Sequence, residues 1–318
     1  MVTPAPLRVV FFGTPEFAVP TLEALIASRH RVVTVVSQPD RPKGRGQRLQ
    51  PTPTRQVADA AGIPVLQPLR LREEGFLEVL AAARPALGVV AAYGRILPER
   101  LLVLPRLGMI NVHASLLPAY RGAAPVHRAV IAGDTETGVT IMRVVQELDA
   151  GPVIAAATRP IGADETTVEV ERGLAALGAP LLVSVVEALA AGRAVETPQD
   201  HDRATFAPKV GREEGTIDWN RPAADIHNLV RGLQPWPLVS AWIGNARHVI
   251  HRTERTDDQA QAPGGTIVEA SGDRLMVTGG DGRVLRVRLI QPEGRRVMAA
   301  QEFLAGRRVP IGTTIGRP

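Results

Sequence analysis

Residues 7–17, LRVVFFGTPEF, decide the fold class, because an apolar run gives way at a glycine to a polar turn. The run LRVVFF is short and rich in β-branched and aromatic side chains, which indicates a buried strand that ends at Gly13. Thr14 is then expected to cap a helix that has Pro15 at its first position.

The same alternation of apolar runs and helical segments continues along the chain. Further strands are expected at 31–37, 64–66, 86–91, 108–113, 138–145 and 152–161. Strands that alternate with helices predict an α/β fold, a Rossmann-like domain with a mostly parallel sheet covered on both faces. The segment Asp164–Ala191 is expected to close this domain as a helix, which Pro180 should break or kink.

The character of the sequence changes after residue 192. Residues 193–208 are polar and contain Pro198 and Pro208, so we interpret them as a linker between a domain at 1–192 and a domain at 209–318. The second domain begins with a short helical stretch, ADIHNLVRGL, and continues with short strands between turns such as APGG and GGDG. This pattern predicts a small all-β unit, a barrel or a sandwich.

Composition excludes several classes of protein. The chain has no cysteine, so disulfides, thiolate nucleophiles and cysteine-bound metals are all excluded. Its apolar tracts are shorter than the roughly 20 residues needed to cross a bilayer, and its first residues do not resemble a signal peptide. We therefore expect a cytoplasmic protein with no membrane partner. The formal charge of +5 leaves open whether the many arginines bind phosphate or reflect genome bias.

The common cofactor motifs are missing. A dinucleotide-binding turn would read G-x-G-x-x-G after the first strand, whereas FFGTPEF has only Gly13 there, which argues against NAD. His248 and His251 are three residues apart, but no further ligands complete a recognisable set. We expect no metal site.

The candidate catalytic residues stand at the end of one predicted strand, GMINVH. Asn111 and His113 are two residues apart, so they project from the same face at the carboxyl end, where open α/β sheets bind ligands. Asp149 lies in the turn QELDAGPVI. An amide, an imidazole and a carboxylate suit acyl transfer to an amine, since the first two can donate to an oxyanion. On the pattern alone, ordinary hydrogen bonding at a strand end and in a turn stays an alternative.

Longer motifs carry a family resemblance. They are FFGTPEFA at 11–18, QPDRPKGRG at 38–46, AYGRILP at 92–98, INVHASLLPAYRGAAP at 110–125, AGDTETGVTIM at 132–142, ELDAGPV at 147–153, IDW at 217–219 and PWP at 235–237. With these motifs in this order, the chain resembles the methionyl-tRNA formyltransferase family nearly end to end.

The resemblance implies an activity and a set of sites. The family transfers a formyl group from 10-formyl-tetrahydrofolate to the α-amino group of methionine on initiator tRNA. Its fold is a Rossmann-like domain followed by an OB-like barrel that binds tRNA. By resemblance, the catalytic residues are Asn111, His113 and Asp149, the tetrahydrofolate-binding segment is Ser115, Leu116, Leu117 and Pro118, and Arg95, Ile96 and Leu97 line the pteridine pocket.

A basic segment at 41–55 is the candidate tRNA contact. It contains Arg41, Lys43, Arg45 and Arg48 without any acidic residue, and it is longer than ordinary connections in α/β units. From its composition alone, such a segment is a phosphate-binding loop or a solvated run of charges. The resemblance implies that it enters the acceptor arm of the tRNA.

Two alternative functions remain open from the sequence. The first is a related folate-dependent formyltransferase or hydrolase that acts on a small amine or a sugar nucleotide. The second is a non-catalytic RNA-binding protein that uses the barrel and the basic segment, which leaves the pair Asn111 and His113 without a role.

Overall fold

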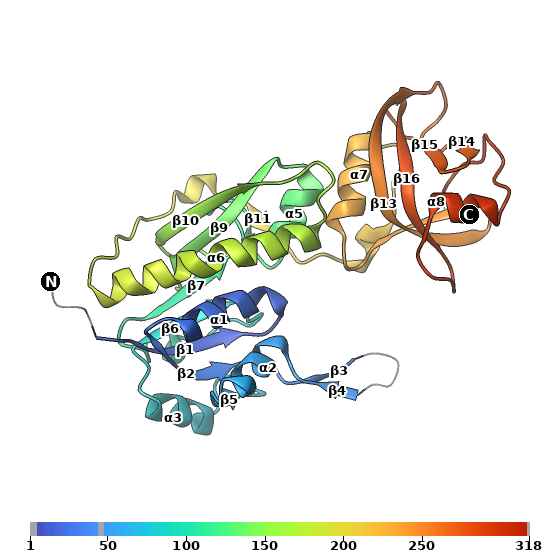
Figure 1. The fold of residues 1–318 in the computed structure, drawn as a ribbon. Helices are drawn as coiled ribbons and strands as arrows, with labels where there is room; N and C mark the ends of the chain where they lie inside the picture. Colours follow the sequence, from blue (N-terminus) through green and yellow to red (C-terminus); the bar gives the residue numbers. More distant parts are fainter. Residues whose placement is uncertain (1–4, 44–47, 317–318) are drawn as a thin grey trace. The chain divides into compact units, whose positions relative to one another are not determined.

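The computed structural model describes residues 5–43 and 48–316, and the chain forms two compact units (Figure 1). The first unit comprises Met1–Pro125, Thr137–Arg159 and Glu171–Ala207. The second comprises Val126–Glu136, Pro160–Val170 and Pro208–Pro318. The second unit therefore includes two short pieces from the part of the chain predicted to form the first domain.

The first unit contains a seven-stranded sheet in the order β10-β9-β7-β6-β1-β2-β5. Its strands are β1 (Arg8–Gly13), β2 (Arg31–Val36), β5 (Val65–Leu66), β6 (Leu87–Ala91), β7 (Met109–His113), β9 (Glu136–Arg143) and β10 (Val153–Pro160). From β5 to β7 neighbouring strands are parallel, and β9 is antiparallel to β7. The prediction of a mostly parallel α/β sheet is confirmed.

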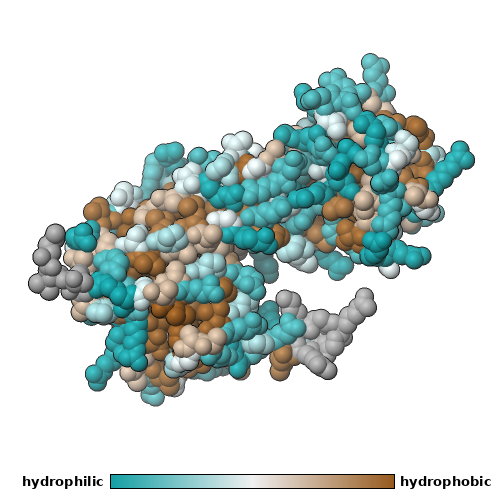
Figure 2. Space-filling model, in the orientation of Figure 1, coloured by the Kyte–Doolittle hydropathy of each residue, from teal (hydrophilic) through white to brown (hydrophobic). Residues whose placement is uncertain are grey.

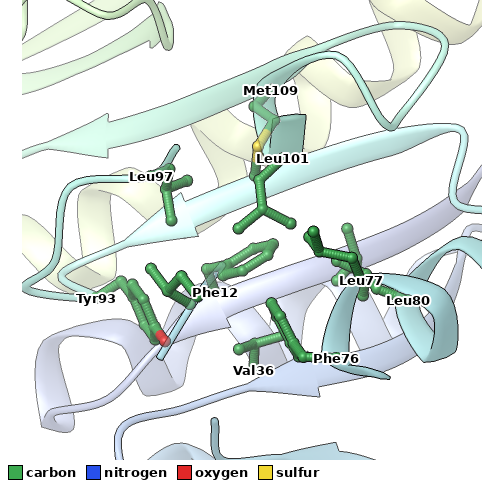
Figure 3. Packing of buried hydrophobic residues seen from close by; sticks show 11 residues of the cluster. Phe12, Val36, Phe76, Leu77, Leu80, Tyr93, Leu97, Leu101 and Met109 are labelled. Atoms are coloured by element: carbon green, nitrogen blue, oxygen red, sulfur yellow. The ribbon is translucent and has the colours of Figure 1, made fainter. Parts of the chain in front are cut away.

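Helices connect these strands and cover the sheet. They are η1 (Glu16–Ala18), α1 (Val19–Ala27), α2 (Pro53–Ala60), α3 (Glu74–Ala82), α4 (Glu99–Leu102), α6 (Thr167–Ala190) and the 3-10 turn η2 (His201–Arg203). Against the sheet lies an apolar cluster in which the ring of Phe12 meets Tyr93 edge to face, with centroids 5.5 Å apart (Figure 3). Phe76 and Leu77 reach this cluster from α3, and Leu101 reaches it from α4. The cluster fixes the strands whose ends carry the candidate site.

The predicted cap of the first helix is wrong. The chain leaves β1 through η1, and α1 begins only at Val19 with Ala18 at its N-cap. The hydroxyl of Thr14 instead accepts a hydrogen bond from the backbone N–H of Gln38 at 3.2 Å. Thr14 therefore ties the end of β1 to the segment that follows β2, the neighbouring strand.

Pro180 is expected to break or kink the closing helix, and the break is wrong, because α6 is one helix of 24 residues with Pro180 inside it. This helix is long and apolar enough to cross a membrane, but helices in the core of a protein often have the same length and composition. Its buried residues recur every three or four positions: Val170, Leu174, Ala175, Ala179, Leu182, Val185, Val186 and Leu189. At Gly178 an added Cβ would lie 3.2 Å from both Val112 and Val139 of the sheet. This packing stabilises the helix despite a cost of about 3 kcal/mol for an internal proline.

The basic segment at 41–55 contains regular structure. Strands β3 (Arg41–Lys43) and β4 (Arg48–Gln50) form an antiparallel pair in which Arg41 lies opposite Gln50. In Figure 1 this hairpin projects beyond α2 and β5 of the first unit. The basic segment therefore includes a strand pair over its described part.

The second unit is built on an antiparallel sheet in the order β12-β13-β16-β15-β14, with β17 beside β16. Its elements are α5 (Pro125–Ala132), η3 (Arg212–Gly215), α7 (Ala223–Gly232), β12 (Val239–Ile243), β13 (Ala246–Gln259), β14 (Ile267–Ser271), β15 (Arg274–Thr278), β16 (Arg283–Pro292), β17 (Met298–Ala299) and α8 (Ala300–Ala305). Thr314 bridges Thr266 beside β14, and Ile315 bridges Ile243 of β12. The C-terminal segment thus joins the two edges of the sheet, in agreement with the predicted small β-barrel.

One face of this sheet is hydrophilic. Along β13 buried residues such as His248, Ile250 and Thr253 lie among half-buried and exposed ones. In Figure 2 the visible surface of this unit is mostly teal, whereas apolar residues gather over the first unit around α1 and α2. An antiparallel sheet with one face in water produces this surface.

His227 on α7 links stability to pH. Its Nε2 donates to the Ala163 carbonyl at 3.0 Å, and its Nδ1 lies 3.0 Å from the Thr253 hydroxyl. Burial lowers the pKa of this imidazole, against the opposing effects of Ala163 and Asp164. The unfolded chain therefore takes up the proton first as pH falls. The contribution of the neutral His227 ring to the stability of the fold is fully present above about pH 6.5, the pKa of an unperturbed histidine. This contribution is lost as the pH falls below that value.

We expect the stability difference between the wild type and His227→Gln to shrink from pH 7 to pH 5. Through His227, the free energy of unfolding of the wild type should fall by at most about 1.4 kcal/mol per pH unit. The variant lacks this histidine, so its free energy of unfolding should not change for this reason. Urea unfolding of both proteins at the two pH values measures the difference. A difference that stays constant would show that His227 is not the group responsible.

Candidate active site

Asn111 and His113 project from the same face of β7, as alternate residues of one strand. Asn111 lies opposite Val90 of β6, and His113 lies opposite Thr140 of β9. His113 is buried and Asn111 is half-buried. Strands on both sides of β7 therefore fix the backbone of the pair at the carboxyl end of the strand.

Asp149 is brought to His113 by the turn between β9 and β10. Its Oδ2 lies 3.7 Å from Nδ1 of His113 and accepts a hydrogen bond from the backbone N–H of Gly122 at 2.9 Å. The backbone of Asp149 is left-handed, with φ of 47°. This conformation costs a non-glycine residue on the order of 1 kcal/mol, although aspartate tolerates it better than most. The turn thus holds the carboxylate beside the imidazole.

The second nitrogen of His113 is also occupied. Nε2 lies 2.9 Å from the carbonyl oxygen of Tyr120, which can only accept, so Nε2 carries a proton. Tyr120 is itself left-handed, with φ of 61°, and its N–H donates to the hydroxyl of Thr205 at 2.9 Å. The orientation of the imidazole therefore depends on the loop 114–122 and on Thr205.

The predicted tetrahydrofolate segment, Ser115 to Pro118, follows β7 directly. The hydroxyl of Thr140 donates to the Ser115 carbonyl at 2.7 Å and accepts from the N–H of Leu117 at 3.1 Å. The hydroxyl of Ser115 donates to the Ala119 carbonyl at 2.6 Å, and the bond between Leu117 and Pro118 is cis. The half-buried side chain of Leu116 lies close to Gly138 of β9. These contacts hold the segment in a defined shape next to His113.

The predicted pteridine residues follow β6, the parallel neighbour of β7. Arg95 donates to the carbonyls of Pro68 and Leu69 at 3.2 and 2.9 Å. Ile96 is 84% exposed, while Leu97 is buried in the cluster of Figure 3. An exposed apolar side chain at the carboxyl end of the sheet fits a flat heterocycle, so Ile96 suits the implied ligand. The side chain of Leu97 belongs to the core.

The predicted tRNA-contacting residues lie on the hairpin of β3 and β4. Arg41 is exposed and donates to Oε1 of Gln38 at 3.2 Å. Lys43 and Arg48 lie opposite each other in the strand pair. Arg45 lies outside the described residues. The hairpin therefore presents at least one exposed cation from a short strand.

The structure adds site residues that sequence reasoning missed. Strand β8 (Arg121–Gly122) pairs with β11 (Phe206–Ala207), which belongs to the predicted linker. This strand pair positions the backbone N–H of Gly122 to donate a hydrogen bond to the carboxylate of Asp149. Arg121 is buried, as is Gln199 from the same predicted linker. A sequence pattern does not distinguish such buried polar residues from solvated ones.

Within residues 5–43 and 48–316, no group of three or more histidine, aspartate and glutamate side chains is arranged to hold a metal ion. The candidate site itself offers an amide from Asn111, an imidazole from His113 and a carboxylate from Asp149.

Comparisons with known proteins show the family to which the chain belongs. A family model described as formyl transferase matches residues 7–186, and one described as formyl transferase, C-terminal domain, matches residues 209–308. A methionyl-tRNA formyltransferase of Moorella thermoacetica is 46% identical over 310 residues, covering 98% of this chain and 99% of its own length. That of Pseudomonas fluorescens is 46% identical over 313 residues, covering 98% of each chain.

Solved structures share the fold at lower identity. The N-formyltransferase of Helicobacter canadensis, in complex with folinic acid and dTDP-3-aminofucose, superposes with a TM-score of 0.67 at 16% identity. The match covers 90% of this chain and 99% of that one. With both family models matched in order and relatives similar over almost their whole length, the chain belongs to the formyl transferase family.

Proposed function

We propose that the chain transfers the formyl group of 10-formyl-tetrahydrofolate to the α-amino group of methionyl initiator tRNA, for translation initiation. The observation that carries this conclusion is the 46% identity to methionyl-tRNA formyltransferases over nearly the full length of both chains. A formyltransferase whose structure holds a sugar nucleotide shares only 16% identity with it. The relatives therefore favour an aminoacyl-tRNA over a small amine as the acceptor.

The proposed reaction is an attack of the neutral amine on the formyl carbon. A new bond forms between the amine nitrogen and that carbon, and the bond from the carbon to N10 of the folate breaks. The amide of Asn111 and the imidazole of His113 donate to the formyl oxygen as it becomes an oxyanion. The proton lost by the amine leaves with N10, so atoms and charge balance.

Asp149 supports this chemistry through His113. Its carboxylate lies 3.7 Å from Nδ1, so a proton on that nitrogen would form an ion pair with it. The Nε2–H is held by the Tyr120 carbonyl, and donation to an oxyanion requires exchange of that hydrogen bond. The carboxylate thus faces the ring nitrogen opposite Nε2 and helps to keep the ring in place while the formyl group is transferred.

Binding of the two substrates is assigned to separate parts of the chain. Ser115, Leu116, Leu117 and Pro118 bind tetrahydrofolate with Arg95, Ile96 and the backbone at Leu97. The catalytic domain is residues 1–192, residues 193–208 join it to the next, and residues 209–318 form the OB-like tRNA-binding domain. The enzyme acts in the cytoplasm, where charged initiator tRNA is found.

Arg41, Lys43, Arg45 and Arg48 are proposed to contact the tRNA backbone. The support is the strand pair of β3 and β4, in which Arg41 is exposed. Contacts between arginine or lysine and phosphate release counterions, so they weaken steeply as salt rises.

We expect the double variant Arg41→Ala, Lys43→Ala to raise the KM for methionyl-tRNA by about tenfold at low salt, since two phosphate contacts are lost. The KM for 10-formyl-tetrahydrofolate should not change. Steady-state formylation at several salt concentrations measures both constants. Arg100→Ala is the control, because Arg100 is an exposed arginine of the same unit outside the hairpin. An unchanged KM for the tRNA would favour a small acceptor.

The proposed function itself is tested by formylation of charged initiator tRNA with the purified chain. Product should form only when 10-formyl-tetrahydrofolate and methionyl-tRNA are both present. A parallel assay offers an amino-sugar nucleotide in place of the tRNA. Turnover of the sugar nucleotide alone would replace the proposal with the small-acceptor alternative, and no turnover of either would favour RNA binding without catalysis.

A further inference from the structure

We propose that Gln199 is a positioning residue that holds Asp149 in its catalytic orientation, which makes the predicted linker part of the active site. The inference rests on the proposed function, in which Asp149 acts on His113. Gln199 does not contact the reacting groups. It acts through the backbone on either side of Asp149.

The side-chain amide of Gln199 is fully engaged. Its Nε2 donates to the carbonyls of Asp149 at 2.8 Å and of Gly151 at 2.7 Å. Its Oε1 accepts from Nε and Nη2 of Arg121 at 3.1 and 2.8 Å. Only one orientation of the amide satisfies these partners, because carbonyls accept and a guanidinium donates. Gln199 is 7% exposed and Arg121 is 2% exposed, so water does not replace these contacts.

These two hydrogen bonds clamp the turn that presents the carboxylate. Asp149 has a left-handed backbone, and its carbonyl and that of Gly151 are both bound to the same amide nitrogen. An added Cβ at Gly151 would lie 2.0 Å from the carbonyl oxygen of Arg143, so the turn is also closely packed against β9. Release of the clamp would let the Asp149 backbone relax out of this region. The carboxylate would then leave the Gly122 N–H and the imidazole.

The same segment of chain orients the imidazole. Thr205 accepts from the N–H of Tyr120 at 2.9 Å, and the Tyr120 carbonyl accepts from Nε2 of His113. The Thr205 carbonyl also accepts from the N–H of Arg121 at 2.8 Å. Residues 199–207 thus hold both members of the pair, Asp149 through Gln199 and His113 through Thr205.

Gln199→Glu separates positioning from packing, because the two side chains have nearly the same shape. The carboxylate still accepts from Arg121 but cannot donate to the two carbonyls. We expect kcat to fall by about tenfold, since small misplacements of catalytic groups cost that much or more. The KM for each substrate should stay within about twofold, because no substrate contact is removed. Steady-state and single-turnover formylation measure these constants.

The decisive comparison places Gln199→Glu in an Asp149→Asn background. If Gln199 acts through Asp149, the second change should add little to the loss that Asp149→Asn already causes. A merely structural role would lower the rate by the same factor in both backgrounds and would overturn the proposal. Gln291→Glu is the control, because Gln291 likewise donates to a backbone carbonyl and accepts from a side chain, in the second unit. It should keep the wild-type kcat.

Two further measurements keep the proposal testable. If Gln199→Glu does not fold, the double variant Arg121→Met, Gln199→Leu removes the pair without leaving a buried charge, and the same fall in kcat is expected. If the wild type does not formylate methionyl-tRNA, the proposed function fails on its own. Crystal structures of wild type and Gln199→Glu then decide. Loss of the hydrogen bond between Asp149 and Gly122 in the variant would support the positioning role of Gln199. An Asp149 in the same position in both structures would overturn that role.

Discussion

Replacing His113 with alanine is expected to lower the single-turnover rate of formylation by about a hundredfold, the usual cost of losing one oxyanion donor. The substitution removes the Nε2–H that Tyr120 holds and the ring that Asp149 faces. Binding of methionyl-tRNA should change little, because the loss concerns a charge that develops only in the transition state. The rate is measured with enzyme in excess over tRNA and saturating 10-formyl-tetrahydrofolate.

Asn111→Ala should cause a loss of similar size, since its amide serves the same oxygen. His251→Ala is the matched control, because His251 is a half-buried histidine of the second unit that pairs with Gln291. It should retain the wild-type rate. A rate near that of the wild type for both His113→Ala and Asn111→Ala would end the catalytic assignment.

Replacing Phe12 with alanine should reduce the free energy of unfolding of the first unit by about 3–5 kcal/mol. Phe12 is completely buried and meets Tyr93 edge to face in the cluster of Figure 3. The loss combines the transfer free energy of the ring with the cavity left among rigid neighbours. Urea unfolding followed by far-UV circular dichroism measures it, and the transition of the first unit should move to lower urea.

Phe206→Ala is the matched control for stability. Phe206 is 65% exposed, so the same substitution should change the unfolding free energy by less than about 1 kcal/mol. Equal losses for the two phenylalanines would mean that the cluster around Phe12 does not carry the stability of this unit.

The sheet could be predicted because its central strands β1, β6 and β7 are mostly buried on both faces. Runs such as LRVVFF and GMINVH are mostly apolar, and in the structure they become β1 and β7 within one residue of the expected start. The position of Asn111 and His113 followed from the period of a strand. These features depend on local pattern, which a sequence displays directly.

Features that depend on tertiary contacts could not be predicted in the same way. Pro180 costs a hydrogen bond locally, but the apolar stripe of α6 keeps the helix continuous. Thr14 has the chemistry of a cap, yet its hydroxyl meets the N–H of Gln38 from the loop after the neighbouring strand. The hairpin of β3 and β4 is held by pairing between residues that show no strand pattern. In each case a distant partner outweighs the local preference.

The residues of the candidate site fall into the same two groups, those that a local pattern predicts and those that depend on tertiary contacts. The approach of Asp149 to His113 was inferred from the family resemblance rather than from spacing, since the two lie 36 positions apart. Gln199 carried no signal, because a glutamine in a polar segment looks like a solvated residue. Its burial becomes evident only when both of its amide donors are found on backbone carbonyls.

The pairing of β8 with β11 determines where the chain can be joined to a related chain in a chimera. Consider a chimera joined at residue 192, where the composition changes. Its residues at positions 199 and 205 would come from the relative, although they contact the catalytic domain of this chain. A splice after Ala207 keeps Gln199 and Thr205 with the chain that they evolved beside. Chimeras meant to exchange tRNA preference without loss of turnover should therefore be joined there.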